Sequence, residues 1–264
     1  MKSKPLVLLE LALFFALSFL ISRLGIWPIG AINGFFKTAL GSNWNYGFLL
    51  YKILLVGLVL LVFRRRLLPR ILGRGGNLSA LPYGLLFAVM AMAPACIGLL
   101  TGMHELQQLD PTAVCDIVLF QLINDSVEEL TYRGYFLERA NEAFPKRWDL
   151  GGFTAGPGVL ASGVFFGLAH LLNPFDPFAG RFGLAPMWGL TTLGSGIMFG
   201  LLREAFGSLI PSILFHALPD ILGNFTTERG EGSPLLIAMM SIMYIAVFFL
   251  MGFYARRRKR QAVR

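Results

Sequence analysis

The stretch from Cys115 to Tyr135 concentrates polar side chains inside an otherwise apolar run. Its polar members include Asp116, Gln121, Asn124, Asp125, Glu128, Glu129 and Arg133. Carboxylates of this kind can accept a proton from water and return one to a leaving group. Ionisable groups at membrane depth cost several kcal/mol unless they face a protein interior. The stretch therefore predicts a helix whose polar face points into a bundle and carries a functional site.

The spacing of these residues separates two faces of that helix. One stripe runs at steps of four, three and four residues through Gln121, Asp125, Glu128 and Tyr132. Glu129 and Arg133 lie four residues apart on a neighbouring stripe, in the order that favours an ion pair. We expect that pair to hold Glu129 ionised and structural, and to leave Glu128 free to act. A buried ion-pair network that only locks helices together is the alternative.

Two of the three histidines strengthen the functional interpretation. His170 and His216 lie inside apolar runs, whereas His104 falls in a short connection beside Glu105, where we expect solvated surface. A single core histidine usually serves one structural hydrogen bond. Two of them in the same small bundle as an acidic helix favour a site.

Composition indicates the class of protein around this site. The chain has 264 residues, of which 55% are apolar and 14% charged, whereas an average soluble domain carries about a quarter charged residues. Apolar runs suited to crossing a hydrocarbon core of about 30 Å recur along the sequence. They lie near residues 6–27, 44–63, 81–101, 113–137, 156–172, 187–202, 207–226 and 234–254. We predict an all-α, polytopic membrane protein with about eight transmembrane helices, because a bilayer offers unpaired backbone groups no partner.

The connections between these runs are short, so residues 1–264 are expected to form a single transmembrane domain. The first run follows Lys2 and Lys4 and has some features of a signal peptide. Glu10 interrupts its apolar stretch and no clear cleavage site follows. An uncleaved first span is therefore the favoured interpretation.

The basic residues indicate the orientation. Eight crossings place both termini on one side, and most of the clustered cations fall on that side. The opposite loops hold only Lys37, Arg181 and Arg229. The side with the termini holds Lys2, Lys4, Arg64, Arg65, Arg66, Arg70, Arg74, Arg139, Lys146, Arg147, Arg203, Arg256, Arg257, Arg258, Lys259, Arg260 and Arg264. We expect both termini in the cytoplasm, in what is best explained as a bacterial inner-membrane protein. The net charge of +8 arises from these flanking clusters, so the lipid bilayer is the expected partner and nucleic acid is not.

Three short motifs occur in order on separate apolar runs. Residues 128–133, from Glu128-Glu129 to Arg133, resemble the EExxxR motif of the CPBP family, the CAAX proteases and bacteriocin-processing enzymes also called Abi proteins. Phe166 to His170 resembles that family's FxxxH motif, and His216 to Asp220 resembles its HxxxN motif, in which Asp can replace Asn. The resemblance covers about residues 125 to 225, within a catalytic-motif core of about 113–226.

The resemblance implies an intramembrane glutamic endopeptidase, related to the type II CAAX prenyl protease, that needs no covalent enzyme intermediate. It gives catalytic places to Glu128, Glu129, Arg133, His170, His216 and Asp220. Glu128 would take a proton from water, His170 would orient that water or help to deprotonate it, and His216 would stabilise the oxyanion. We expect no metal or other cofactor, and a membrane-associated protein or peptide as substrate.

Asp220 is the departure from the common motif. An amide can donate to an oxyanion, whereas an ionised carboxylate can only accept, so we expect Asp220 to hold His216 protonated. Asn224 lies one turn further along and could supply a donor, although a capping role fits it better. His216 lies near the start of its apolar run, so bringing it level with Glu128 requires a tilt or a helix break, and Pro211 and Pro219 suggest a break.

Three other functions remain open. His170, His216 and Glu128 could form the His₂Glu set of a zinc hydrolase, although the chain lacks HExxH. Ser195, between two glycines, only partly suggests a serine nucleophile. A non-enzymatic membrane protein, such as a transporter, a scaffold or a bacteriocin-immunity protein, would use the acidic helix for binding or proton relay.

Overall fold

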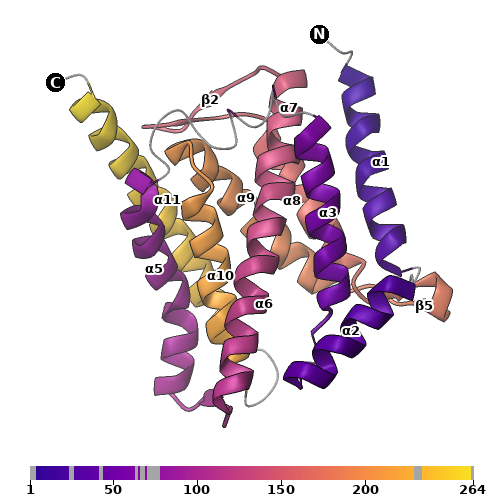
Figure 1. Ribbon diagram of the computed structural model, residues 1–264. Helices are drawn as coiled ribbons and strands as arrows, with labels where there is room; N and C mark the ends of the chain where they lie inside the picture. Colours follow the sequence, from indigo (N-terminus) through magenta and orange to yellow (C-terminus); the bar gives the residue numbers. More distant parts are fainter. Residues whose placement is uncertain are drawn as a thin grey trace.

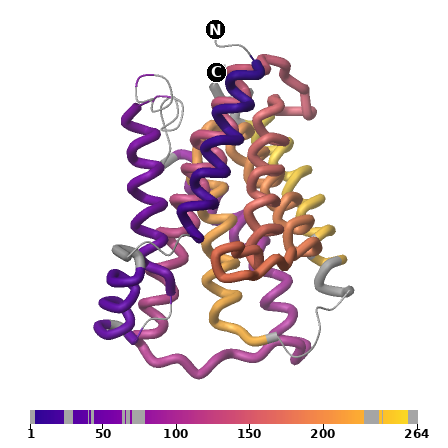
Figure 2. Tube along the Cα trace, turned by 90° about the vertical axis from the view of Figure 1, so that its right-hand side faces the viewer, coloured from indigo at the N-terminus to yellow at the C-terminus, as the bar shows by residue number. Residues whose placement is uncertain are grey.

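In the computed structural model, the described residues are 4–23, 27–41, 44–62, 65, 69, 78–228 and 234–262. They form a bundle of helices (Figures 1 and 2). The helices are α1 (Lys4–Arg23), α2 (Trp27–Leu40), α3 (Tyr46–Val62), α5 (Leu81–Leu100), α6 (Pro111–Glu129), α7 (Leu137–Ala143), α8 (Gly158–Leu171), α9 (Pro186–Phe206), α10 (Ile210–Asn224) and α11 (Pro234–Ala262). A π-helical segment, η2 (Leu130–Phe136), joins α6 to α7, and η1 (Leu78–Ala80) and η3 (Pro177–Ala179) are short 3₁₀ turns. The all-α prediction is confirmed.

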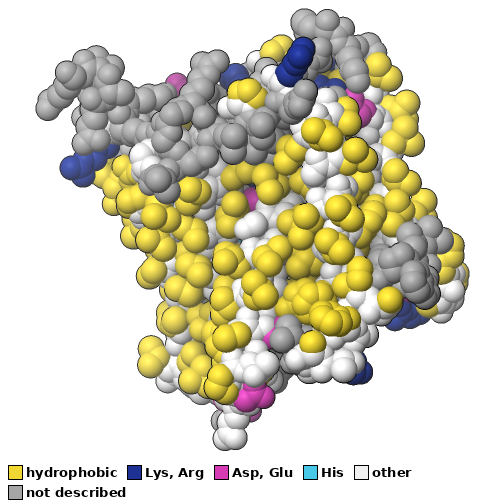
Figure 3. Space-filling view, in the orientation of Figure 1, with side chains coloured by type: hydrophobic (Ala, Val, Ile, Leu, Met, Phe, Trp, Pro, Cys, Tyr) yellow, Lys and Arg dark blue, Asp and Glu magenta, His cyan; other side chains and the backbone are white. Residues whose placement is uncertain are grey.

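Each of the eight predicted runs contains a helix, whereas α2 and α7 lie outside these runs except for their first residues. Among the described helices, α1 and α5 are long and apolar enough to cross a membrane, while α3 and α8 are apolar but shorter. The eight crossings therefore stay a prediction. Leu13 on α1, Leu58 on α3 and Val89 on α5 are each more than half exposed. Hydrophobic side chains cover much of the face in Figure 3, as a lipid-facing surface requires.

The two ends of the bundle differ in what they hold. The start of α1, the β2 segment and the end of α11 lie at one end, and α2 and β5 lie at the other (Figure 1). This arrangement agrees with two termini on one side of a membrane. Of the basic residues used for the orientation, Lys2, Arg64, Arg66, Arg70, Arg74, Arg229 and Arg264 lie outside the described residues.

Three short antiparallel pairs tie the connections together. β1 (His104–Leu106) pairs with β6 (Thr226–Glu228), β2 (Trp148–Asp149) with β3 (Thr154–Ala155), and β4 (Phe175–Asp176) with β5 (Arg181–Phe182). His104 is part of the first pair and was expected at a solvated surface. It is partly buried instead, because its ring packs where a Cβ on Gly98 would lie, and its Nδ1 is 3.4 Å from Thr226 Oγ1.

The helix that carries the first motif has a defined start. Asp110 accepts from the Ala113 backbone N–H at 2.8 Å, and Pro111 occupies the first turn, so both capping signals are present. The α-helix continues to Glu129, and η2, which begins at Leu130, carries Arg133. π-helical segments inside α-helices frequently mark functional sites.

Glycines bring α8 and α9 close together. A Cβ on Gly167 would lie 2.7 Å from Leu193 Cβ and 2.8 Å from the Gly189 carbonyl oxygen. A Cβ on Gly196 would lie 3.0 Å from the Cα of Gly163. Small residues allow helix backbones to approach in this way. The close packing fixes α8, which carries the FxxxH motif, against α9.

An ion pair attaches α1 to the rest of the bundle. Arg139 Nη2 on α7 lies 2.7 Å from Glu10 Oε2, and Tyr135 Oη donates to Glu10 Oε1 at 2.9 Å. Glu10, the residue that interrupts the first apolar run, therefore has partners inside the protein. It holds α1 beside the helices of the motifs.

Candidate active site

Glu129 joins two of the motifs in the interior of the bundle. Its Oε1 accepts from Arg133 Nη1 at 2.9 Å and is 3.0 Å from His216 Nδ1. The side chains of Glu129 and Arg133 are fully buried. The expected ion pair is present, and Glu129 also orients His216. Such partners are required, because an unpaired charge in an apolar interior is costly.

Arg133 is enclosed by aromatic rings. Its guanidinium carbon lies 4.6 Å from the centroid of Phe166 and 4.8 Å from that of Phe199, within cation–π range. Its Nη2 donates to the Gly196 carbonyl at 3.0 Å. Arg133 therefore connects the first motif to α8 and α9, and its charge is matched by a carboxylate, a carbonyl and two ring faces.

Glu128 is not free. Lys52 on α3 donates from Nζ to Glu128 Oε1 at 2.7 Å and to Asn124 Oδ1 at 2.9 Å. Asn124 Nδ2 lies 3.3 Å from the same Glu128 oxygen. Glu128 therefore lies outside the Glu129–Arg133 pair, and that it is free to act stays a prediction. It has a partner of its own, because a carboxylate in apolar surroundings needs a cation and α3 supplies one.

His170 has a hydrogen bond that fixes its ring. Its Nδ1 is 2.9 Å from the Phe166 carbonyl oxygen one turn earlier. A carbonyl can only accept, so Nδ1 carries the proton and, in the neutral ring, Nε2 is left with a lone pair. The Phe166 ring packs edge-on against both histidines, at 4.5 Å from His170 and 5.5 Å from His216 between centroids.

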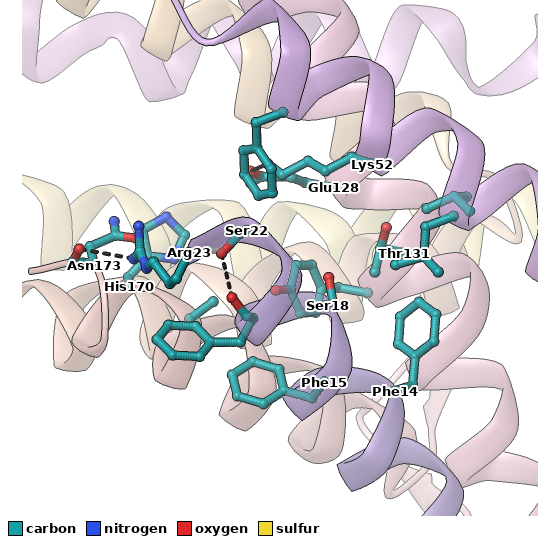
Figure 4. Close-up of a pocket in the computed structure, with 16 residues that line it drawn as sticks. Phe14, Phe15, Ser18, Ser22, Arg23, Lys52, Glu128, Thr131, His170 and Asn173 are labelled. Carbon is teal, nitrogen blue, oxygen red and sulfur yellow. Dashed lines mark hydrogen bonds and ion pairs between the residues drawn. The ribbon is translucent and has the colours of Figure 1, made fainter. Parts of the chain in front are cut away.

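A cavity of about 180 Å³ lies beside these groups (Figure 4). Glu128 and His170 both line it. Its remaining lining residues are Phe14, Phe15, Ser18, Phe19, Ser22 and Arg23 of α1, Phe48, Lys52, Leu55 and Val56 of α3, and Thr131, Tyr132, Ala169 and Asn173. Figure 4 shows Lys52 next to Glu128 on one side of the cavity, and His170 near Arg23 and Asn173 on another.

His216 lies behind Glu128 and is not among the residues that line this cavity. Its Nε2 faces two carboxylates, Asp220 Oδ2 at 3.7 Å and Asp125 Oδ1 at 4.0 Å. Asp220 was expected to be the group that accepts from His216. Glu129 makes the direct hydrogen bond instead, because it approaches the other ring nitrogen from α6, and Asp220 acts at longer range.

The helix that carries His216 is continuous. α10 runs from Ile210 to Asn224 with Pro219 inside it and Pro211 in its first turn. Of the two alternatives, a tilt or a helix break, α10 therefore contradicts the break. Asn224 Nδ2 donates to the Asp220 carbonyl at 2.8 Å, which agrees with a capping role.

Two alternatives can be compared with these contacts. Asp125, Glu128 and His216 each offer a ligand atom, and these three atoms lie within 4.8 Å of one another. This group differs from the expected zinc set, since Asp125 takes the place of His170. Ser195 Oγ is 2.6 Å from Tyr244 Oη on α11, so this serine is hydrogen-bonded to a phenol rather than to a histidine.

Lys52 was missed by the sequence analysis. It is the single charged residue in the stretch Tyr46–Val62, and an ionisable residue inside an apolar run is by itself a sign of function. Apart from Arg23, the α1 residues that line the cavity carried no such signal. Their serines and phenylalanines are ordinary for an apolar helix.

The fold and site define a class of protein: a helical bundle with an apolar surface, a buried Glu–Arg–His cluster and a cavity that holds a second Glu and His. Residues 110–222 match the family model described as type II CAAX prenyl endopeptidase Rce1-like. Over this segment the chain is similar to that family, which is consistent with the resemblance to the CPBP family. All six predicted site residues lie inside the match. Comparisons with curated proteins and with solved structures give no match.

The family is a membrane-embedded protease family. The match therefore supports a peptide hydrolase that acts on a protein or peptide substrate.

Proposed function

We propose that this chain is a glutamic intramembrane endopeptidase that cleaves a peptide bond in a membrane-associated protein or peptide. The observation that carries the proposal is the position of Glu128 and His170 on one cavity. These two residues come from separate motifs and separate helices. A carboxylate and an imidazole facing the same space are the groups that water activation requires.

In the proposed reaction, a water molecule in the cavity attacks the carbonyl carbon of the scissile peptide. Its proton passes to Glu128, the new C–O bond forms, and the carbonyl electron pair moves to the oxygen. Glu128 then gives the proton to the leaving nitrogen as the C–N bond breaks. His170 accepts from the water through Nε2, because its Nδ1 proton is held by Phe166.

His216 supplies positive charge from behind Glu128 in this proposal. One of its ring nitrogens lies within 4.8 Å of a Glu128 oxygen. Three carboxylates face the ring: Glu129 at one nitrogen, and Asp125 and Asp220 at the other. A cationic imidazole stabilises negative charge that develops on the substrate oxygen, here by electrostatic attraction from outside the cavity.

The location of the enzyme is part of the proposal. We place the chain in a bacterial inner membrane as a multi-pass protein with both termini in the cytoplasm. The support is the apolar surface, the two membrane-length helices and the shared end of the termini. The substrate would then reach the cavity at membrane depth.

A metal-dependent hydrolase is the second candidate, favoured by the close approach of Asp125, Glu128 and His216. A divalent ion there would share Glu128 with the Lys52 ammonium, which already lies 2.7 Å from it. Two cations on one carboxylate repel each other, so the glutamic mechanism fits this arrangement better.

The test is a comparison of the membrane proteome in cells that carry the wild-type chain or Glu128→Gln. Mass spectrometry should find at least one membrane-associated protein that is shortened in the first cells and full-length in the second. A matched control is Glu105→Gln, an exposed position on β1. Identical proteomes for wild type and Glu128→Gln would contradict the proposal.

A further inference from the structure

Lys52 is a cation on the cavity wall that lies outside the residues matched to the family. Its Nζ is bound to Glu128 and Asn124, and its side chain is 20% exposed. Nζ also lies 4.8 Å from the centroid of Phe48, so it is held on α3 by a ring face as well. The ammonium therefore lies beside the group that would accept the proton of water.

The proposed reaction moves negative charge away from Glu128. Before the attack, Glu128 is ionised and the substrate carbonyl is neutral. After the attack, Glu128 holds a proton and the anionic charge is on the tetrahedral oxygen. Lys52 loses its ionic partner at the step in which the oxyanion gains its charge. A cation that lies beside both Glu128 and the tetrahedral oxygen has an anionic partner before and after the attack.

The side chain can make this change of partner. A lysine ammonium is a compact charge on a flexible four-carbon stem, with three donors that can be redirected. His216 is less suited to direct contact, because its Nδ1 is committed to Glu129 and it does not line the cavity. Lys52 does line it.

We propose that Lys52 has two successive roles: it holds Glu128 ionised before the reaction and then donates a hydrogen bond to the oxyanion. This inference rests on the proposed function, since it concerns the same cavity and the same reaction. It assigns a catalytic contact to a residue outside the three motifs. His216 and Glu129 then support the site from behind.

The test measures binding rather than turnover. It uses Glu128→Gln protein, in which Lys52 has no ionic partner at position 128. The probes are two inert peptides that span the cleavage site found in the proteome comparison. One carries a phosphinate in place of the scissile amide, as an anionic tetrahedral mimic, and the other carries a neutral ketomethylene. The quantity of interest is the ratio of the two dissociation constants, which does not depend on folded yield.

We expect the phosphinate to bind about 10²-fold more tightly than the ketomethylene in Glu128→Gln, the size of effect typical of one oxyanion donor. Adding Lys52→Met should bring the ratio close to one, and adding Lys52→Arg should keep most of the preference. Lys37→Met, on the exposed surface of α2, is the control and should leave the ratio unchanged.

An unchanged ratio in the Lys52→Met background would overturn the inference. Loss of the preference with His216→Ala but not with Lys52→Met would assign the oxyanion contact to His216 instead. Retained cleavage by Glu128→Gln itself is a different result, because it would remove the proposed general base whatever the binding ratio shows.

Discussion

His216 Nδ1 lies 3.0 Å from Oε1 of Glu129, a residue 87 positions earlier in the chain. The same oxygen accepts from Arg133. One buried carboxylate therefore orients a histidine of the third motif and neutralises the arginine of the first. The helices that carry the first and third motifs therefore meet at Glu129.

Glu129→Gln should reduce both folded yield and stability. The amide keeps the volume but leaves the fully buried Arg133 without its anion, a change that typically costs about 3 kcal/mol or more. The measurement is monodisperse yield and thermal unfolding in detergent, with Glu105→Gln as the control. If Glu129→Gln has the yield and melting temperature of the wild type, Arg133 does not depend on this carboxylate.

Gly167→Ala should destabilise the α8–α9 pair, because the added Cβ would lie 2.7 Å from Leu193 Cβ and 2.8 Å from a backbone oxygen. Gly194→Ala is a matched control on α9, where a Cβ meets nothing within 4 Å. We expect a loss of about 1–3 kcal/mol for the first change and none for the second. Equal melting temperatures for the two variants would contradict the close packing.

The sequence predicts the helices well and their partners less well. Apolar runs give the position of each helix, because hydropathy is a local property. The Glu129–Arg133 pair is also local, at four residues along one helix, and could be predicted. The Lys52–Glu128 pair joins residues 76 positions apart, and no local spacing rule indicates that α3 passes the first motif. No local spacing rule indicates either that α1 residues line the cavity.

Asp220 shows the limit of reasoning from a motif. Its four-residue spacing from His216 suggests a direct contact, yet the carboxylate lies 3.7 Å from Nε2 and is 48% exposed. Glu129 provides the shorter bond from another helix. Which of several carboxylates approaches a histidine depends on helix packing, and spacing alone does not determine it.

Asp220→Asn should therefore lower the maximal rate by less than about tenfold and move the pH–rate profile, since His216 keeps Glu129 and loses one of the anions that face it. Single-turnover cleavage across pH, for wild type, Asp220→Asn and Asp220→Ala in one detergent, measures both effects. A raised maximal rate in Asp220→Asn with an unmoved profile, together with a loss of about 10²–10³ in Asp220→Ala, would instead indicate that position 220 contacts the oxyanion.

Strong chelators should leave the activity of the purified, reconstituted protein intact, because the proposed steps use only Glu128, His170 and water. The measurement is cleavage after prolonged treatment with a zinc-binding chelator, followed by addition of zinc, manganese or magnesium. Inactivation with selective rescue by one metal would favour the second candidate and the group Asp125, Glu128 and His216.

The most direct test of the central claim is the cleavage rate of Glu128→Gln in proteoliposomes, on the substrate identified from cells. The amide keeps the size of the side chain but cannot accept a proton from water. We predict that Glu128→Gln inserts and purifies like the wild type and cleaves at less than about 1% of its rate, while Glu105→Gln cleaves normally. A normally folded Glu128→Gln protein that retains a substantial part of the wild-type rate would contradict the glutamic mechanism.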